Sequence, residues 1–205
     1  MMNSVMAVLI VKLTPSEYLA IERRAEYKSE YYRGEMFAMA GGSPRHSLLA
    51  ARLIGTLLNR LKGKGCEVYT SDLKVLTQPN GLYTYPDVTV VRGKPLLADD
   101  EPDVIVNPKV VFEVLSKSTE GHDRGFKFQQ YKKIESLDQY ALVSQTEPLI
   151  ESFSRGVGRA WTEYSEARGV EAKLVLKPLD IELPLAEIYQ DFDFRSLISS
   201  LGCTV

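Results

Sequence analysis

Two carboxylates interrupt two strongly apolar stretches of this sequence. Asp87 stands directly before Val-Thr-Val-Val, and Glu113 stands within the run Val-Val-Phe-Glu-Val-Leu at residues 110–115. Burial of an unpaired carboxylate costs several kcal/mol, so each acid needs a cation or strong hydrogen-bond donors opposite it. If the two stretches are neighbouring strands, both acids project from one end of a sheet. Two carboxylates plus water can hold Mg²⁺; the alternative is that each acid pairs with an arginine or caps a loop.

A basic segment follows the stretch that contains Glu113. The polar residues 116–119 lead into a helix predicted over residues 121–134, which carries Arg124, Lys127, Lys132 and Lys133. Helical spacing sets Lys132 and Lys133 away from the face of Lys127. A basic helix alone is most often a solvated surface. Beside two buried acids, however, Lys127 becomes a candidate for an active-site cation.

The elements before these residues are a helix, a hairpin and a second helix. Thr14-Pro15-Ser16-Glu17 supplies a capping hydroxyl, a first-turn proline and a glutamate, which predicts a helix that runs to about Arg24. Residues 29–40 are rich in aromatic residues and methionine and break at Arg33-Gly34, which predicts a β-hairpin. Gly41-Gly42 follows. Ser43-Pro44 then caps a helix whose leucines recur at helical spacing up to Leu61.

Six strands and a short final helix complete the predicted elements. The strands cover about residues 67–76, 87–91, 110–115, 139–144, 149–155 and 161–165, and the helix starts at about Leu185. The two strands with acids are otherwise apolar, which is typical of strands buried on both faces. This order predicts an α/β fold with a mixed central β-sheet flanked by helices, preceded by an N-terminal helix and hairpin. Without a linker or repeat, residues 1–205 are expected to form one domain.

Composition excludes several classes of protein. The formal net charge of −2 argues against a protein that coats nucleic acid through bulk electrostatics, so phosphate binding must be local. The two cysteines form neither a disulfide framework nor a zinc motif. The apolar segment Val5–Val11 is far shorter than the roughly 20 residues that span a bilayer, and no basic residue precedes it. We therefore expect a cytoplasmic protein. No nucleophile elbow or Walker-type loop indicates acyl transfer or nucleotide hydrolysis.

Several short motifs follow one another in a distinctive order: Gly34-Glu35, Ser43-Pro44-Arg45-His46, Pro86-Asp87, Glu113–Thr119 and Asp123–Lys127 with Tyr131. Their order and spacing resemble the Uma-two family of bacterial restriction endonucleases, over roughly residues 13–153. That family is assigned to the PD-(D/E)xK nuclease superfamily. The resemblance implies a restriction-endonuclease-like core and Mg²⁺-dependent cleavage of DNA, with Mn²⁺ as a possible replacement. Nothing in the residues themselves separates DNA from RNA as the substrate.

Carried over to this chain, the resemblance assigns Asp87 and Glu113 as catalytic acids and metal ligands. The superfamily pattern has a lysine two residues after the second acid, where this chain has Leu115. In the family a lysine on the next helix is thought to substitute, and the matching residue is Lys127; Lys117 is its rival. Glu35 matches the Gly-Glu of the hairpin. It is expected to complete the catalytic site as a third ligand or through water, or else to hold a backbone amide.

Three further expectations concern His46, the assembly and a rival function. For His46, a capping or hairpin hydrogen bond is at least as well supported as proton transfer. Endonucleases that cut both strands usually pair, so we expect a homodimer, for which Val5–Val11 is a candidate interface. A catalytically decayed module that kept the nuclease fold for DNA binding or another interaction also fits. The missing lysine at position 115 favours this alternative.

Overall fold

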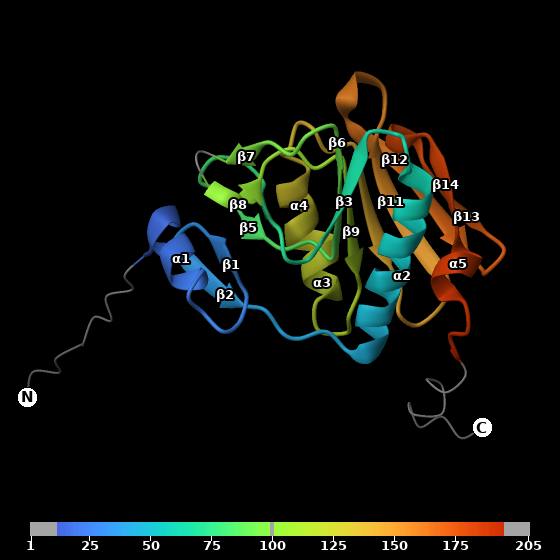
Figure 1. Cartoon of the computed structure of the whole chain (residues 1–205), viewed down its shortest axis with the longest axis horizontal. Coiled ribbons are helices and arrows are strands. Elements are labelled where there is room, and N and C mark those ends of the chain that lie inside the picture. Colours follow the sequence, from blue (N-terminus) through green and yellow to red (C-terminus); the bar gives the residue numbers. More distant parts are fainter. Residues whose placement is uncertain (1–11, 99–100, 195–205) are drawn as a thin grey trace, which may run out of the picture.

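A six-stranded mixed sheet forms the centre of the computed structural model, which describes residues 12–98 and 101–194 (Figure 1). Its strand order is β12-β11-β10-β9-β6-β3. β9 and β10 run parallel, and the other neighbours run antiparallel. The bounds are β3 (Cys66–Thr70), β6 (Val88–Arg92), β9 (Val110–Val114), β10 (Gln139–Val143), β11 (Leu149–Arg155) and β12 (Trp161–Arg168). The predicted mixed central sheet is confirmed.

Helix α2 (Pro44–Leu61) covers one face of this sheet together with C-terminal elements. Its fully buried Leu49, Leu53 and Leu57 pack in one cluster with the inward side chains of β6 and β9. Ser43 caps α2 as predicted, since its Oγ accepts a hydrogen bond from the N–H of His46 at 3.1 Å. The C-terminal elements are β13 (Lys173–Leu176), η3 (Lys177–Leu179), β14 (Ile181–Pro184) and α5 (Leu185–Tyr189).

The opposite face packs against a short helical stretch that lies between the two large sheets (Figure 1). The sequence predicts one helix over residues 121–134, but the structure divides it into α3 (Glu120–His122), the π-helical turn η1 (Asp123–Lys127) and α4 (Phe128–Tyr131). Gly125 lies inside the π turn. Such turns occur frequently at functional sites.

The second sheet joins the N-terminal helix and hairpin to the core. α1 (Pro15–Glu22) begins with the predicted capping box at Thr14. The hairpin turns at Arg33-Gly34, whose φ angles of 49° and 96° suit a tight hairpin turn. The sheet order is β2-β1-β5-β4-β8-β7. The strands are β1 (Ser29–Tyr32), β2 (Glu35–Ala38), β4 (Lys74–Leu76), β5 (Tyr83–Thr84), β7 (Leu97–Ala98) and β8 (Glu101–Ile105).

The structure corrects the predicted strand over residues 67–76. A turn in which the N–H of Leu73 donates to the carbonyl of Thr70 separates β3 from β4, and these strands belong to different sheets. Strand β12 also extends three residues beyond the predicted end at Ser165, and η2 (Val157–Arg159) precedes it. Of the helices in the described part of the chain, none has the length and apolar character needed to cross a membrane.

Candidate active site

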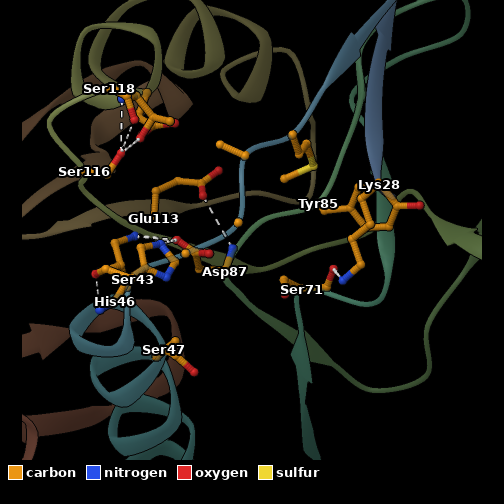
Figure 2. A pocket seen from close by; sticks show the side chains of 18 of the residues that line it. Lys28, Ser43, His46, Ser47, Ser71, Tyr85, Asp87, Glu113, Ser116 and Ser118 are labelled. Atoms are coloured by element: carbon orange, nitrogen blue, oxygen red, sulfur yellow. Dashed lines mark hydrogen bonds and ion pairs between the residues drawn. The ribbon is translucent and has the colours of Figure 1, made fainter. Parts of the chain in front are cut away.

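Asp87 and Glu113 meet because their strands are antiparallel neighbours. Val88 pairs with Phe112, so Asp87 before β6 and Glu113 near the end of β9 lie at the same end of the strand pair. The N–H of Asp87 lies 3.4 Å from Oε2 of Glu113. Figure 2 shows the two side chains close together in one pocket. The two strands are therefore neighbours, which was the condition for both acids to project from one end of the sheet.

The pocket has a volume of about 710 Å³ and is lined by several separate parts of the chain. The first turn of α2 forms one wall, and the loop after β9 forms another. The segment 39–43 between the hairpin and α2 also lines it, and Lys28 and Tyr85 stand across from α2 (Figure 2). Asp87, Glu113, Asp123 and Lys127 line it as well. Polar groups from distant parts of the sequence thus converge on one cavity.

Lys127 is buried and surrounded by carboxylates. Its Nζ lies 3.1 Å from Oε1 of Glu30, 3.2 Å from Oε1 of Glu113 and 3.5 Å from Oδ1 of Asp123. Although burial opposes the effect, the charges of Glu113 and Glu30 raise the pKa of Lys127 well above its usual range. Lys127 is therefore a fixed positive charge in the wall of the pocket.

Glu113 lies at the centre of this group. Its Oε1 accepts hydrogen bonds from Lys127 and from the hydroxyl of Tyr131, the latter at 2.8 Å. Burial raises the pKa of Glu113; Lys127 opposes that rise, and the carboxylates of Asp123 and Asp87 add to it. Burial also raises the pKa of Asp123. After burial, the closeness of Asp87 to these two acids also raises their pKa, and a bound cation would relieve that repulsion between carboxylates.

Glu30 is a functional candidate that the sequence interpretation missed. It projects from β1, and its Oε1 accepts hydrogen bonds from Thr84 as well as Lys127. His122 Nε2 lies 3.5 Å from its Oε2. Burial works against ionisation, but His122 and Lys127 lower the pKa of Glu30 to about 2. One signal could have identified it, since Glu30 stands in the aromatic strand Ser-Glu-Tyr-Tyr, as Asp87 and Glu113 stand in apolar ones.

Comparisons with known proteins agree with this geometry. A family model named Uma2 and described as "Putative restriction endonuclease" matches residues 15–186. The chain belongs to the Uma2 family. Two uncharacterized proteins of Synechocystis sp. are similar to it. The protein slr1290 is 36% identical over 186 residues, which is 89% of this chain and 94% of that protein. The protein sll1609 is 33% identical over 162 residues, which is 79% of this chain and 91% of that protein.

A solved structure supports the fold of this Uma2 chain. The crystal structure of a "putative nuclease belonging to DUF820" from Anabaena variabilis superposes with a TM-score of 0.69 at 15% identity. The match covers 86% of this chain and 97% of that one. At 15% sequence identity, the match supports a shared fold alone. The predicted family and the predicted nuclease-like α/β architecture are thus confirmed.

The structure of the Uma2 chain does not bring all predicted site residues together. Asp87, Glu113 and Lys127 all line the same pocket. Glu35 is exposed on β2, and Lys117 is exposed in the loop after β9. Neither residue belongs to the pocket lining formed by residues 12–98 and 101–194. Glu30, five residues before Glu35, supplies the hairpin carboxylate that reaches the site.

His46 binds a side chain that its sequence position alone could not identify. Its Nε2 lies 3.1 Å from Oδ2 of Asp87, which also accepts a hydrogen bond from the N–H of Val114 at 2.7 Å. The hydrogen bond to Asp87 raises the pKa of His46. His46 therefore contacts one of the two predicted acids directly.

The donor chemistry of the pocket fits a hard divalent cation. Within the described ranges, no group of three or more His, Cys, Asp and Glu side chains is arranged as a complete metal site. Mg²⁺, however, commonly takes one or two carboxylates and completes its shell with water. Asp87 and Glu113 present carboxylate oxygens to one cavity, where burial and neighbouring acids raise the pKa of Glu113. A bound cation would relieve the repulsion between these carboxylates.

Proposed function

We propose that this Uma2 chain is a metal-dependent endonuclease that hydrolyses phosphodiester bonds of DNA. The observation that carries the proposal is the contact of 3.2 Å between Lys127 Nζ and Glu113 Oε1, in the pocket that Asp87 also lines. Leu115 occupies the strand position where the superfamily pattern has lysine. Lys127 in the π turn η1 contacts Glu113 instead, so the proposed site still combines two acids and one lysine.

Asp87 and Glu113 are the residues proposed to hold the ion, with Mg²⁺ as the proposed metal and Mn²⁺ as a replacement. A divalent ion at this place would supply positive charge that polarises the scissile phosphate and favours ionisation of the attacking water. Because Glu113 is buried and bonded to Tyr131 through Oε1, its carboxylate is held in one orientation. This preorganisation supports binding of the ion without rearrangement of the pocket.

Lys127 is proposed to orient the attacking water and to offset negative charge that develops on the phosphate. Its three carboxylate neighbours keep it charged and restrict its side chain. Glu30 on the hairpin holds the ammonium group of Lys127 on one side, and Glu113 keeps that group next to the proposed metal site. The chain uses no nucleophilic side chain in this scheme, since water is the nucleophile.

Local donors rather than overall charge are proposed to bind the DNA strand. Lys28 lines the pocket, as do hydroxyl groups of the loop after β9 and of the first turn of α2. These hydroxyl-bearing residues are Ser43, Ser47, Ser116, Ser118 and Thr119. Hydroxyls and lysine are common donors to phosphate oxygens. Such a local site is compatible with the net charge of −2.

A homodimer acting in the cytoplasm, where DNA and Mg²⁺ are present, completes the proposal. A dimer would let two active sites cut both strands. The candidate interface segment Val5–Val11 lies outside the described residues. Light scattering coupled to size exclusion would measure the assembly, and a molar mass of one chain would remove this part of the proposal.

The decisive experiment measures cleavage of supercoiled plasmid, single-stranded DNA and bacterial genomic DNA in Mg²⁺ or Mn²⁺. Genomic DNA is included because it contains short recognition sequences that one plasmid can lack. We expect metal-dependent cutting by the wild type and its loss in folded Asp87→Ala and Glu113→Gln variants. A wild type that cuts none of the three, and whose melting temperature does not rise with millimolar Mn²⁺, would support the catalytically decayed module instead.

A further inference from the structure

One carboxylate oxygen of Asp87 is held from two elements. Nε2 of His46 lies 3.1 Å from Oδ2 of Asp87, and the N–H of Val114 donates to the same oxygen over 2.7 Å. Val114 directly follows Glu113, so the second bond ties Asp87 to the strand of the other acid. Oδ1 of Asp87 accepts no hydrogen bond from the described residues and is left for a ligand in the pocket.

Gly42 stands against the imidazole of His46. A Cβ atom built at Gly42 would lie 2.9 Å from Nδ1 and 3.3 Å from Cγ of His46. The φ angle of Gly42 is not in the left-handed region, so only this contact disfavours alanine. The neighbouring Gly41 is a natural control, because a Cβ there would have no atom within 4 Å.

We propose that Gly42 and His46 act as positioning residues that fix Asp87 for a divalent cation. Gly42 leaves room for the imidazole, His46 donates to Oδ2, and Oδ1 of Asp87 is thereby presented to the ion. The inference rests on the metal site of the proposed function, but its tests measure binding of Mn²⁺ rather than cleavage. Loss of a partner that orients a metal ligand typically weakens metal affinity by about 10–100-fold.

The first test compares Mn²⁺ affinity of the full chain by calorimetry for the wild type, His46→Ala and His46→Gln. We expect the alanine variant to bind about 10–100-fold more weakly. The glutamine variant should retain most of the affinity, because its Nε2 donor has a similar reach. Wild-type affinity in His46→Ala, or equally weak binding by His46→Gln, would overturn the role of His46 as a donor.

Leu48→Ala provides the matched control, since Leu48 lies two residues after His46 on α2, is exposed and does not line the pocket. Leu48→Ala should bind Mn²⁺ like the wild type. If it loses as much affinity as His46→Ala, the effect does not depend on the contact with Asp87 and the inference fails. Circular dichroism of each variant verifies its folding before the titrations are compared.

The second test uses the two glycines and does not require removal of His46. Gly42→Ala should weaken Mn²⁺ binding because the added Cβ displaces the imidazole, whereas Gly41→Ala should not. In the His46→Ala background, Gly42→Ala should have no further effect, as expected for residues that act through one another. Equal loss with Gly41→Ala, or undiminished loss in the His46→Ala background, would contradict the positioning role of Gly42.

The outcomes separate this inference from the endonuclease proposal. If the wild type binds Mn²⁺ with the expected pattern of variants but cuts no DNA, the positioning role stands and the endonuclease proposal fails. If the wild type cuts DNA and His46→Ala binds Mn²⁺ normally, the positioning role fails and the endonuclease proposal stands. A wild type that binds no Mn²⁺ overturns both.

Discussion

Two buried lysines of this protein lie among carboxylates, yet only one of them lines the pocket. Nζ of Lys74 lies 2.9 Å from Oε2 of Glu22 and also contacts Asp103, which pairs with Arg23. Lys127 contacts three carboxylates at the edge of the candidate active site. The Lys74 group consists of Lys74, Glu22, Asp103 and Arg23, and the Lys127 group consists of Lys127, Glu30, Glu113 and Asp123. Burial and ion pairing alone do not distinguish the two groups.

The pKa of Glu113 is shifted in the opposite direction from that of Asp103, whereas the pKa of Glu30, which also contacts Lys127, is lowered like that of Asp103. Although burial opposes it, Arg23 and Lys74 lower the pKa of Asp103 to about 2, as expected in a paired cluster. Burial raises the pKa of Glu113, and two neighbouring carboxylates add to that rise. The mutual repulsion of Glu113, Asp123 and Asp87 beside a cavity, rather than a buried lysine as such, therefore distinguishes the candidate site from a structural ion-pair cluster.

The largest expected effect is on stability at Lys74. Lys74→Met leaves Glu22 and Asp103 with one cation fewer, and breaking a buried ion pair costs about 3–5 kcal/mol. Chemical unfolding would measure the loss. Lys173→Met is the control, since its exposed pair with Glu182 should contribute at most about 1 kcal/mol. If folded Lys74→Met also lost cleavage per molecule, the Lys74 group would not be purely structural.

A smaller effect is expected on the rate of DNA cleavage when Lys127 is replaced. Removal of one preorganised electrostatic group typically lowers kcat by about 10²–10³-fold, so Lys127→Met should cut DNA that much more slowly. Steady-state kinetics on a cleaved substrate would measure it. Lys117→Met should keep the wild-type rate because Lys117 is exposed outside the pocket. The reverse pattern would transfer the catalytic role to Lys117.

The hairpin acids offer a third comparison. Glu30→Gln weakens the anchor of Lys127, and a misplaced catalytic group can lower the rate by up to about 10²-fold. Glu35→Gln should leave the rate unchanged, because Glu35 is exposed on β2. Both rates would be measured at saturating Mg²⁺. A defect confined to Glu35→Gln would restore Glu35 as the hairpin residue of the site.

The last comparison concerns opposite pH dependences of stability in metal-free protein. Because the folded pKa of Glu113 is raised above 4.5, its contribution to stability falls as pH rises above that value, by at most about 1.4 kcal/mol per unit. The folded pKa of Asp103 is lowered to about 2, so its contribution is present above 3.8 and is lost as pH falls toward 2.

Unfolding of the wild type, Glu113→Gln and Asp103→Asn across pH in EDTA would test these signs. Relative to Glu113→Gln, the wild type should lose stability toward high pH. Relative to Asp103→Asn, it should lose stability toward low pH. Parallel curves for all three proteins would contradict the proposed difference between the two lysine groups.

Local sequence signals identified much of the fold correctly. The capping box at Thr14, the Ser43 cap and the turn at Arg33-Gly34 depend on residues a few positions apart, so they can be recognised without tertiary information. The split between β3 and β4 was missed because both segments are rich in strand-forming residues. Only their different partners in two sheets separate them.

The candidate site was partly predictable for the same reason. Asp87 and Glu113 were identified because an acid in an apolar strand requires a compensating partner, and this requirement can be recognised from the sequence. The sequence does not reveal which residue the partner is. Lys127 was inferred from its place on the helix after Glu113, whereas Glu30 and His46 lie 97 and 41 residues from their contacts at Lys127 and Asp87.

The sequence by itself determined which strands are buried, where the main helices begin and which acids must find a counter-charge. These features follow from hydrophobic spacing, capping chemistry and the desolvation of charge. The tertiary structure alone decided that Glu30 rather than Glu35 reaches Lys127, and that His46 holds Asp87 beside Gly42. Strand pairing and packing of distant segments set those contacts, because distances of about 3 Å arise only when separate elements have been brought together.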